Sequence, residues 1–171
     1  MISFIVPAHN EELWIGSCLN SIHTAMETIA EPYEVIVVDD ASTDSTLEIA
    51  RQSARVISVD HRKISAVRNE GARAASGETL FFVDADTKAN ADNVMAAIAA
   101  LRSGAIGGGC IPELDGPVPF WGRIIHRVAM FGGRLFHIVG GCFLFCTREA
   151  YLATGGFSEH FASHPNLVAI R

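Results

Sequence analysis

Two aspartates, Asp84 and Asp86, follow directly after the apolar run Leu80–Val83. Two like charges this close repel each other, and each carboxylate resists the loss of its hydration. A divalent cation would offset both costs, because Mg²⁺ and Mn²⁺ prefer carboxylate oxygens, water and substrate phosphate to closed cages of protein ligands. The spacing therefore indicates a Mn²⁺ or Mg²⁺ site that an anionic ligand completes, with a diphosphate as the natural candidate.

Cations and further carboxylates at other positions have the chemistry to complete such a site. Lys63 and Arg68 precede the aspartates and can face a diphosphate as charged hydrogen-bond donors. Asp40 ends an apolar run, where its carboxylate can accept a hydrogen bond from a base or a ribose, and Glu11 can do likewise. These residues are therefore candidates for binding a nucleotide that carries a diphosphate.

Apolar runs and helical spacing predict which elements position these residues. Strands are expected at Ile2–Val6, Tyr33–Val38, Val56–Val59, Thr79–Val83 and Ile106–Ile111. Helices are expected between them: one capped by Asn10 with Glu11 and Glu12 in its first turn, one containing Leu47–Ala50, then Ser65–Ala75 and Asn93–Arg102.

The alternation of strands and helices, with strands apolar on both faces, predicts an α/β fold with three layers, α/β/α, and a mostly parallel central sheet. In such sheets ligands bind beyond the carboxyl ends of the strands. The segments after the first four predicted strands are all polar: "PAHNEE", "DDASTD", "DHRK" and "DADT". We therefore expect these segments to meet at one edge of the sheet, where the backbone at Pro7 and Ala8 can grip a flat ring.

Length and composition bound the organisation of the chain. Its 171 residues predict a single domain, 1–171, with a core that buries roughly 70% of the surface of the unfolded chain. The glycine- and proline-rich stretch Gly104–Pro119 is expected to divide it into a nucleotide-binding half, about 1–103, and a short acceptor-side half, about 104–171.

Composition argues against several classes of protein. The net charge is −6 and no lysine- or arginine-rich run is present, so nucleic acid is not an expected partner. The N-terminus lacks the basic region of a signal peptide, and charges and glycines interrupt the apolar stretch Val128–Cys146, which predicts neither secretion nor a membrane span. The cysteines lack zinc-site spacing and fit a reducing compartment. We therefore expect a cytoplasmic protein.

Other residues have both a structural and a functional interpretation. Phe120–Phe136 mixes aromatic and basic residues and is expected to be helical. Phe120 and Trp121 are expected to pack in the interior, with stacking on a sugar or peripheral contact with a membrane as the alternatives. Arg68 and Asn69 are compatible with holding a loop and with touching a ligand.

Five motifs occur in the order and spacing typical of one enzyme family: "PAHNEE", "VVDDASTDST", "AVRNEGARAASGE", "FFVDADT" and "GGF". Together they resemble the family 2 glycosyltransferases, which have the nucleotide-diphospho-sugar transferase fold called GT-A. The resemblance covers Ile2 to about Phe157, nearly the whole chain. It implies a Mn²⁺- or Mg²⁺-dependent enzyme that moves a sugar from a nucleotide-diphosphate donor to an acceptor hydroxyl with inversion. Whether the acceptor is a glycan, a lipid or a small molecule does not follow from it.

The resemblance also implies roles for individual residues. Asp86 is the implied direct metal ligand, while Asp84 contacts the ribose or a metal-bound water. The residues implied to hold the nucleoside are Ala8, Glu11 and Asp40. The residues implied to face the pyrophosphate are Lys63 and Arg68.

The C-terminal tail, "GGFSEHFASHPNLVAIR", departs from the family pattern. Ser158 stands where an aspartate is common, and Ser163–Pro165 stands where an acidic pair carries the catalytic base. Glu159 is the one carboxylate side chain left in the tail. Either Glu159 is the base, or the base is lost and the chain is a catalytically silent nucleotide-sugar-binding module, or the sequence is truncated.

Two other enzyme classes share single features with this sequence. A Rossmann dehydrogenase needs G-x-G-x-x-G directly after its first strand, and "PAHNEE" contains no glycine. A phosphatase with an aspartyl nucleophile is suggested by "VDADT", but Lys88 stands where we expect that class to carry threonine. Both classes are disfavoured on these grounds.

Overall fold

The computed structural model describes residues 1–110, 119–121 and 141–159. The predicted helix Phe120–Phe136 lies mostly outside these residues, and the division of the chain into two halves stays a prediction. The elements follow one another as β1 (Ile2–Ala8), α1 (Ile15–Ile29), β2 (Tyr33–Asp40), α2 (Thr46–Ala50), β3 (Arg55–Val59), α3 (Ile64–Ala74), β4 (Thr79–Val83), α4 (Ala91–Arg102), β5 (Gly107–Gly109), β6 (Phe143–Thr147) and α6 (Arg148–Thr154).

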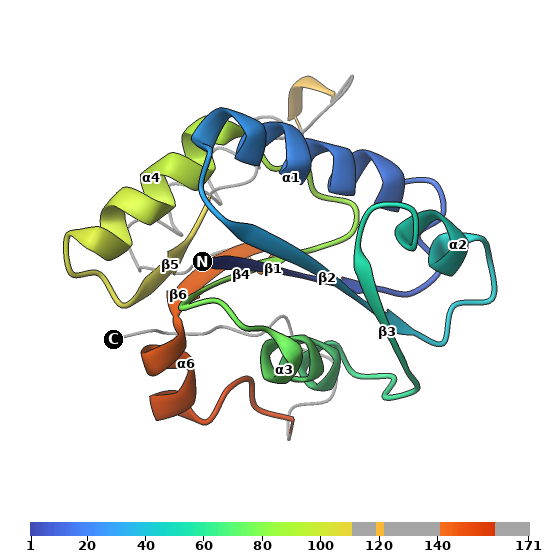
Figure 1. Cartoon of the computed structure of the whole chain (residues 1–171). Helices are drawn as coiled ribbons and strands as arrows, with labels where there is room; N and C mark the ends of the chain where they lie inside the picture. Colours follow the sequence, from blue (N-terminus) through green and yellow to red (C-terminus); the bar gives the residue numbers. More distant parts are fainter. Residues whose placement is uncertain (111–118, 122–140, 160–171) are drawn as a thin grey trace.

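Within the described residues, six strands form one sheet in the order β3-β2-β1-β4-β6-β5. The strands β3, β2, β1 and β4 are parallel, while β6 runs antiparallel to β4 and to β5. Helices α1 and α4 cover one face of the sheet, and α3 and α6 lie on the other (Figure 1). The structure confirms the predicted three-layer α/β/α fold with a mostly parallel sheet.

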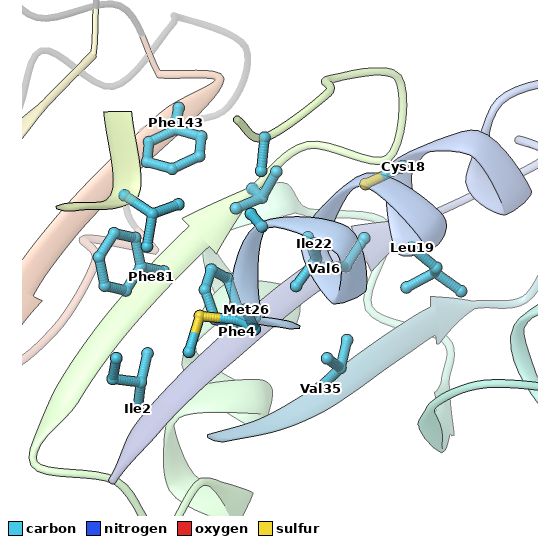
Figure 2. Packing of buried hydrophobic residues seen from close by; sticks show 14 of the residues in the cluster. Ile2, Phe4, Val6, Cys18, Leu19, Ile22, Met26, Val35, Phe81 and Phe143 are labelled. Atoms are coloured by element: carbon cyan, nitrogen blue, oxygen red, sulfur yellow. The ribbon is translucent and has the colours of Figure 1, made fainter. Parts of the chain in front are cut away.

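Side chains on the two faces of the sheet build two hydrophobic cores. Phe4 and Val6 of β1 belong to the core under α1 and α4, while Ile5 belongs to the core under α3. Figure 2 shows the larger core, in which the ring of Phe4 stacks on that of Phe81 with the centroids 5.0 Å apart. Close packing of this kind has low compressibility. The strands that lead into the polar segments are therefore held rigidly by the packing of the core.

The predicted cap of the first helix is wrong. The helix α1 begins at Ile15 with Trp14 as its N-cap, and no acidic residue lies in its first turn. Asn10 has a left-handed backbone with φ of 55°, and its side-chain oxygen accepts a hydrogen bond from the N–H of Thr43 over 2.7 Å. Asparagine tolerates this backbone conformation better than most residues. Asn10 therefore links the loop after β1 to the loop after β2 and does not cap the helix.

The sequence does not predict β6 and α6. The strand β6 lies in an apolar stretch interrupted by glycines, and it separates β4 from β5. The strand β5 is shorter than the predicted Ile106–Ile111, and its glycines permit close packing, since a Cβ on Gly108 would lie 2.8 Å from Cζ of Phe145. The side chain of Thr147 caps α6 by accepting a hydrogen bond from the N–H of Ala150. A capping threonine at this position is the local sequence signal from which the helix could have been predicted.

Phe120 and Trp121 are 80% and 67% exposed, so the prediction that they pack in the interior is wrong. Contact of this pair with a sugar or with a membrane surface stays a prediction. Among the helices of the described ranges, none combines the length and the apolar character needed to cross a membrane.

Glu34 of β2 makes the stability of the folded state depend on pH. Its Oε1 accepts hydrogen bonds from Ser3 Oγ over 2.7 Å and from the N–H of Ser76 over 2.6 Å. Burial by itself would raise the pKa of Glu34, but these hydrogen bonds outweigh it and lower the pKa below the ordinary value of 4.5. The ionised carboxylate therefore stabilises the folded state.

We expect Glu34→Gln to lower the free energy of unfolding by about 1 kcal/mol at neutral pH. Because the folded-state pKa is lowered, the contribution of Glu34 is present above pH 4.5 and is lost as the pH falls through the lowered pKa. The difference between wild type and variant should therefore shrink in acid. Urea unfolding of both proteins at a series of pH values measures it, and a difference that stays constant across this range would contradict the assignment.

Candidate active site

The polar segments after β1, β2, β3 and β4 meet at one edge of the sheet, as predicted, around a pocket of about 420 Å³. The pocket collects the predicted site residues with the exception of Arg68 and Glu159. The residues that line it are Pro7, Ala8, His9, Glu11, Asp40, Arg62, Lys63, Ile64, Val67, Asp84, Ala85 and Asp86.

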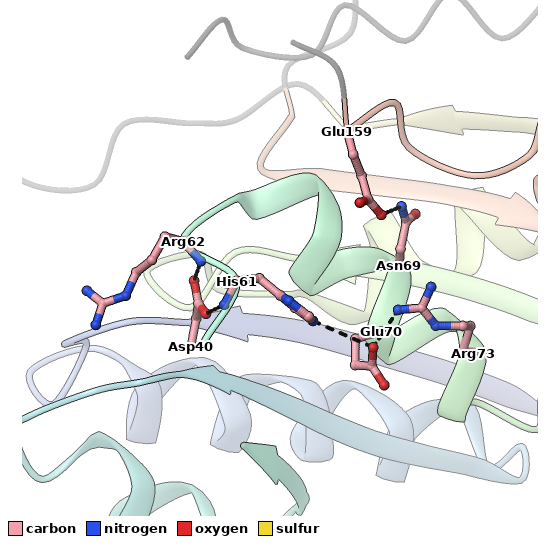
Figure 3. A network of polar contacts seen from close by, with 7 residues as sticks. All are labelled: Asp40, His61, Arg62, Asn69, Glu70, Arg73 and Glu159. Carbon is pink, nitrogen blue, oxygen red and sulfur yellow. Dashed lines mark hydrogen bonds and ion pairs between the residues drawn. The ribbon is translucent and has the colours of Figure 1, made fainter. Parts of the chain in front are cut away.

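Asp40, the last residue of β2, holds the loop that leads into α3. Its two carboxylate oxygens accept hydrogen bonds from the backbone N–H groups of His61 (2.6 Å) and Arg62 (2.9 Å), as Figure 3 shows. Arg62 has a left-handed backbone with φ of 55°. That conformation costs about 1–3 kcal/mol and persists only where surrounding contacts hold it. Asp40 therefore fixes the loop in the conformation in which Arg62 and Lys63 line the pocket.

Asp84, directly after β4, is held by a buried arginine. Nη2 of Arg68 donates to Oδ1 of Asp84 over 2.6 Å and to the carbonyl oxygen of Gly141 over 2.8 Å, and Arg68 is 4% exposed. Burial raises the pKa of Asp84 above its ordinary value; the charge of Arg68 counteracts this, and the charge of Asp86 adds to it. Arg68 thus holds the segment after β4 through a residue that is itself a predicted site residue, and its contact with a pyrophosphate stays a prediction.

Asp86 lies in the wall of the pocket with its side chain exposed. After burial, the charge of Asp86 is the main cause that raises the pKa of Glu11, so carboxylates from two loops share a region of negative potential. Among the described residues, no three His, Cys, Asp or Glu side chains form a group that could hold a metal ion by themselves. Mg²⁺ and Mn²⁺ commonly bind one or two carboxylates together with substrate phosphates. The carboxylates of this pocket therefore fit a divalent cation that binds together with the phosphates of a substrate.

Lys63 stands at the N-cap position of α3 and lines the pocket together with Ile64 and Val67. No side chain caps this end of the helix. Unpaired backbone N–H groups and the positive end of the helix dipole favour an anion at such a position. The start of α3 and the charge of Lys63 therefore suit the diphosphate predicted from the sequence.

Glu159 lies after α6, outside the wall of the pocket, with its side chain exposed. Its Oε1 accepts a hydrogen bond from Nδ2 of Asn69 over 2.8 Å (Figure 3). Asn69 follows Arg68 in α3. Adjacent residues of one helix thus contact the candidate base and the candidate metal-binding segment.

Several residues of the pocket were not predicted. His9 and Arg62 belong to the polar segments "PAHNEE" and "DHRK". The sequence predicts that these segments meet at the edge of the sheet, but it does not single out these two residues. Ile64 and Val67 lie three apart in α3 and supply apolar surface. The apolar spacing in α3 is typical of packing, and nothing in it distinguishes a ligand-facing side chain from a core side chain.

Comparison with known proteins gives this pocket a family context. The family model described as Glycosyl transferase family 2 matches residues 3–163. The chain belongs to this family. Among curated relatives, it is 39% identical over 92 residues to glycosyltransferase AglE of Haloferax volcanii, covering 50% of this chain and 30% of AglE. It is 36% identical over 92 residues to the putative glycosyltransferase EpsH of Bacillus subtilis, covering 50% of this chain and 26% of EpsH. The chain thus matches less than a third of the length of these two relatives.

Known structures of glycosyltransferases share the fold. The mannosyltransferase PcManGT of Pyrobaculum calidifontis, in complex with GDP-Man and Mn²⁺, superposes with a TM-score of 0.76 at 24% identity, covering 96% of this chain and 49% of that protein. Residues 1–349 of Staphylococcus aureus TarS in complex with UDP-GlcNAc give a TM-score of 0.72 at 23% identity, covering 99% of this chain and 52% of that one. At this level of identity the likeness shows the fold, which is the GT-A fold predicted from the motifs.

Proposed function

We propose that this family 2 protein binds a nucleotide-diphospho-sugar with Mn²⁺ or Mg²⁺ and transfers the sugar to an acceptor hydroxyl with inversion. The observation that carries the proposal is the pocket at the strand ends, because Asp84, Asp86 and Lys63 line it together. Membership of the family supports it. The ligands of the structural neighbours, GDP-Man with Mn²⁺ and UDP-GlcNAc, belong to the same chemical class.

The nucleoside is proposed to occupy the part of the pocket beside β1 and β2. Pro7 and Ala8 present backbone at the end of β1, and Asp40 and Glu11 present carboxylates that can accept hydrogen bonds from a base or a ribose. Asp40 is 7% exposed and already accepts two backbone N–H groups, but each carboxylate oxygen has a second lone pair. It can therefore bind the ligand and anchor the loop at the same time.

The diphosphate is proposed to lie between the acidic segment after β4 and the start of α3. Asp86 and Asp84 would hold the cation, and Lys63 would donate to phosphate oxygens. When bound, the cation supplies charge stabilisation for the leaving diphosphate. Arg68 holds Asp84 in place through the 2.6 Å ion pair and so orients the carboxylate before a ligand arrives. Orientation in advance removes the need to rearrange charged groups during the reaction.

Glu159 is proposed to be the general base. The acceptor oxygen would bond to the anomeric carbon while the bond to the diphosphate breaks on the opposite face, which inverts that carbon, and Glu159 would take the hydroxyl proton. A base must come within about 3 Å of that hydroxyl. Glu159 is exposed, so an acceptor can reach its carboxylate from solvent.

Binding and turnover test the proposal in sequence. The thermal unfolding temperature should rise with UDP or GDP when MnCl₂ is present and should rise much less with the nucleotide or MnCl₂ alone. Incubation with UDP-glucose, UDP-GlcNAc or GDP-mannose should then release the nucleotide diphosphate. Binding without release would favour a nucleotide-sugar-binding module over a transferase, and absence of binding to every nucleotide diphosphate would contradict both.

Lys63 gives a test of where the diphosphate lies. We expect Lys63→Gln to weaken binding of UDP or GDP about 10-fold, because a charge-assisted hydrogen bond is lost. Uridine or guanosine, which lack phosphate, should bind unchanged. Arg51→Gln, at an exposed position at the end of α2, is the matched control. Isothermal titration calorimetry measures all three proteins, and equal losses for the nucleoside and the diphosphate would place Lys63 elsewhere.

A further inference from the structure

We propose that Asn69 is a positioning residue that holds the carboxylate of Glu159, the proposed general base. This inference rests on the proposed function, because it gives Asn69 its role through the general base. Asn69 is 7% exposed, and it uses all four hydrogen-bonding positions of its amide. All of these bonds go to the segment formed by α6 and the residues that follow it.

The amide of Asn69 binds this segment in one orientation. Its Oδ1 accepts from the hydroxyl of Tyr151 (2.7 Å) and from the N–H of Phe157 (2.9 Å). Its Nδ2 donates to the carbonyl oxygen of Phe157 (2.9 Å) and to Oε1 of Glu159 (2.8 Å). Burial raises the pKa of Tyr151 to about 12, so its hydroxyl keeps the proton that it donates. Because Phe157 supplies one donor and one acceptor, the amide cannot flip without losing both bonds.

The turn formed by Gly155 and Gly156 lies directly against the side-chain amide of Asn69. Gly155 and Gly156 have φ angles of 76° and 79°, which residues with a side chain rarely adopt. A Cβ on Gly156 would lie 2.8 Å from Oδ1 of Asn69 and 2.7 Å from the hydroxyl oxygen of Tyr151. Glycine at this position therefore allows the chain to approach the amide closely enough for the hydrogen bonds of Phe157.

The same helix holds the donor side of the site. Arg68, the residue before Asn69, forms the ion pair with Asp84 and donates to the carbonyl oxygen of Gly141. The guanidinium carbon of Arg68 lies 5.4 Å from the centroid of the Phe157 ring. Two neighbouring residues of α3 thus fix the acidic segment after β4 and the segment after α6. Substitution of the Asn69 side chain would remove the bond to Glu159 without removing the bond of Arg68 to Asp84.

The hydrogen bond between Asn69 and Glu159 distinguishes a positioning role from a purely structural one. The three bonds to Tyr151 and Phe157 hold α6 and the turn after it, whereas the fourth bond goes to an exposed side chain. That bond fixes an otherwise mobile carboxylate in one rotamer. A base has to be held within hydrogen-bond reach of its proton to be effective.

Asn69→Asp tests this role because it keeps the accepting oxygen and replaces the NH₂, which donates to Glu159 and to the carbonyl oxygen of Phe157, with an oxygen that repels both. We expect release of UDP or GDP from the cleaved nucleotide sugar to slow at least about 100-fold, the lower end of what a positioned base contributes. The Kd of UDP or GDP with MnCl₂ should change less than about 3-fold, since the contacts of Asp84 remain. Tyr151→Phe, which removes a bond on the far side of the same amide, is the matched control and should keep turnover within about 3-fold.

Amide hydrogen exchange supplies a readout that does not depend on activity. In Asn69→Asp, exchange in residues 155–159 should become at least about 10-fold faster, because the two bonds donated by the NH₂ to this segment are lost. The double variant Asn69→Asp/Glu159→Gln reverses the polarity of the hydrogen bond, with the glutamine amide as donor. Protection of residues 155–159 should then return in part, because the bond to the carbonyl oxygen of Phe157 stays lost, while turnover stays as low as in Glu159→Gln alone.

Each outcome has a separate meaning. Wild-type turnover in Asn69→Asp, or unchanged exchange in residues 155–159, overturns the positioning role. Wild-type turnover in Glu159→Gln overturns the general-base assignment of the proposed function, and the exchange data then decide whether Asn69 still holds the segment. If Asn69→Asp does not fold, Glu159→Ala replaces it: one side-chain N–H of Asn69 loses its acceptor, so its NMR signal should shift and exchange faster, and an unchanged signal would refute the inference.

Discussion

Asp86→Ala is expected to remove Mn²⁺-dependent binding of UDP or GDP almost completely. The loss of affinity should exceed the roughly 10- to 100-fold decrease that is typical when a residue behind a metal ligand is replaced, because Asp86 is the proposed ligand itself. Asp84 does not replace it, because Asp84 is already the second proposed ligand and a cation would keep one carboxylate in place of two. Without the cation, the acidic residues of the pocket would repel the diphosphate.

The fold should survive this substitution. Asp86 is exposed, and substitutions at such sites usually change the free energy of unfolding by less than about 0.5 kcal/mol. Removal of its charge also relieves repulsion with Glu11 and Asp84. Asp92→Ala, at an exposed aspartate in the first turn of α4, is the matched control and should bind like wild type. Calorimetric titration that gives Asp86→Ala and Asp92→Ala the same affinity would refute the assignment of Asp86 to the metal.

Arg68→Met is expected to give the largest loss of stability among single changes near the pocket. Removing one partner of a buried ion pair typically costs about 3–5 kcal/mol because the other charge is left uncompensated. The side chains of Arg68 and Asp84 are 5% and 31% exposed. Since Asp84 keeps some contact with water, we expect a loss near the lower end, about 3 kcal/mol. The hydrogen bond to Gly141 and the contact with Phe157 are lost as well.

A double variant separates the charge from the packing. Arg68→Met combined with Asp84→Asn removes the uncompensated charge and should recover part of the lost stability. Arg102→Met removes an exposed pair with Glu31 and should cost less than about 1 kcal/mol. Urea unfolding measures the free energy of unfolding of each protein. Equal losses for Arg68→Met and Arg102→Met, or no recovery in the double variant, would show that the ion pair does not hold the segment after β4.

The parts of the fold that could be predicted depend on local pattern. The run Thr79–Val83 is a strand with the predicted ends, because four of its five residues are apolar and a polar segment with two aspartates follows it. The meeting of the polar segments at one edge follows from the geometry of parallel strands, since their carboxyl ends all lie on the same side. One rule about sheets therefore brought together residues as far apart in sequence as Ala8 and Asp86.

The parts that could not be predicted depend on contacts between distant residues. The local sequence predicts Asn10 as a helix cap, but in the structure its side chain bonds to Thr43 of another loop. The insertion of β6 between β4 and β5 follows from which strands pair, and a single sequence does not contain this information. The bond between Asn69 and Glu159 joins residues 90 positions apart. No local pattern could distinguish this asparagine from a loop-stabilising one.

The most direct test of the account is to locate the cation. Crystals grown or soaked with MnCl₂ and UDP or GDP, and measured at a wavelength where manganese scatters anomalously, should show one peak within bonding distance of a carboxylate oxygen of Asp86 and of a phosphate oxygen. A peak at another position, or nucleotide bound at the strand ends with no peak beside Asp86, would contradict the proposal.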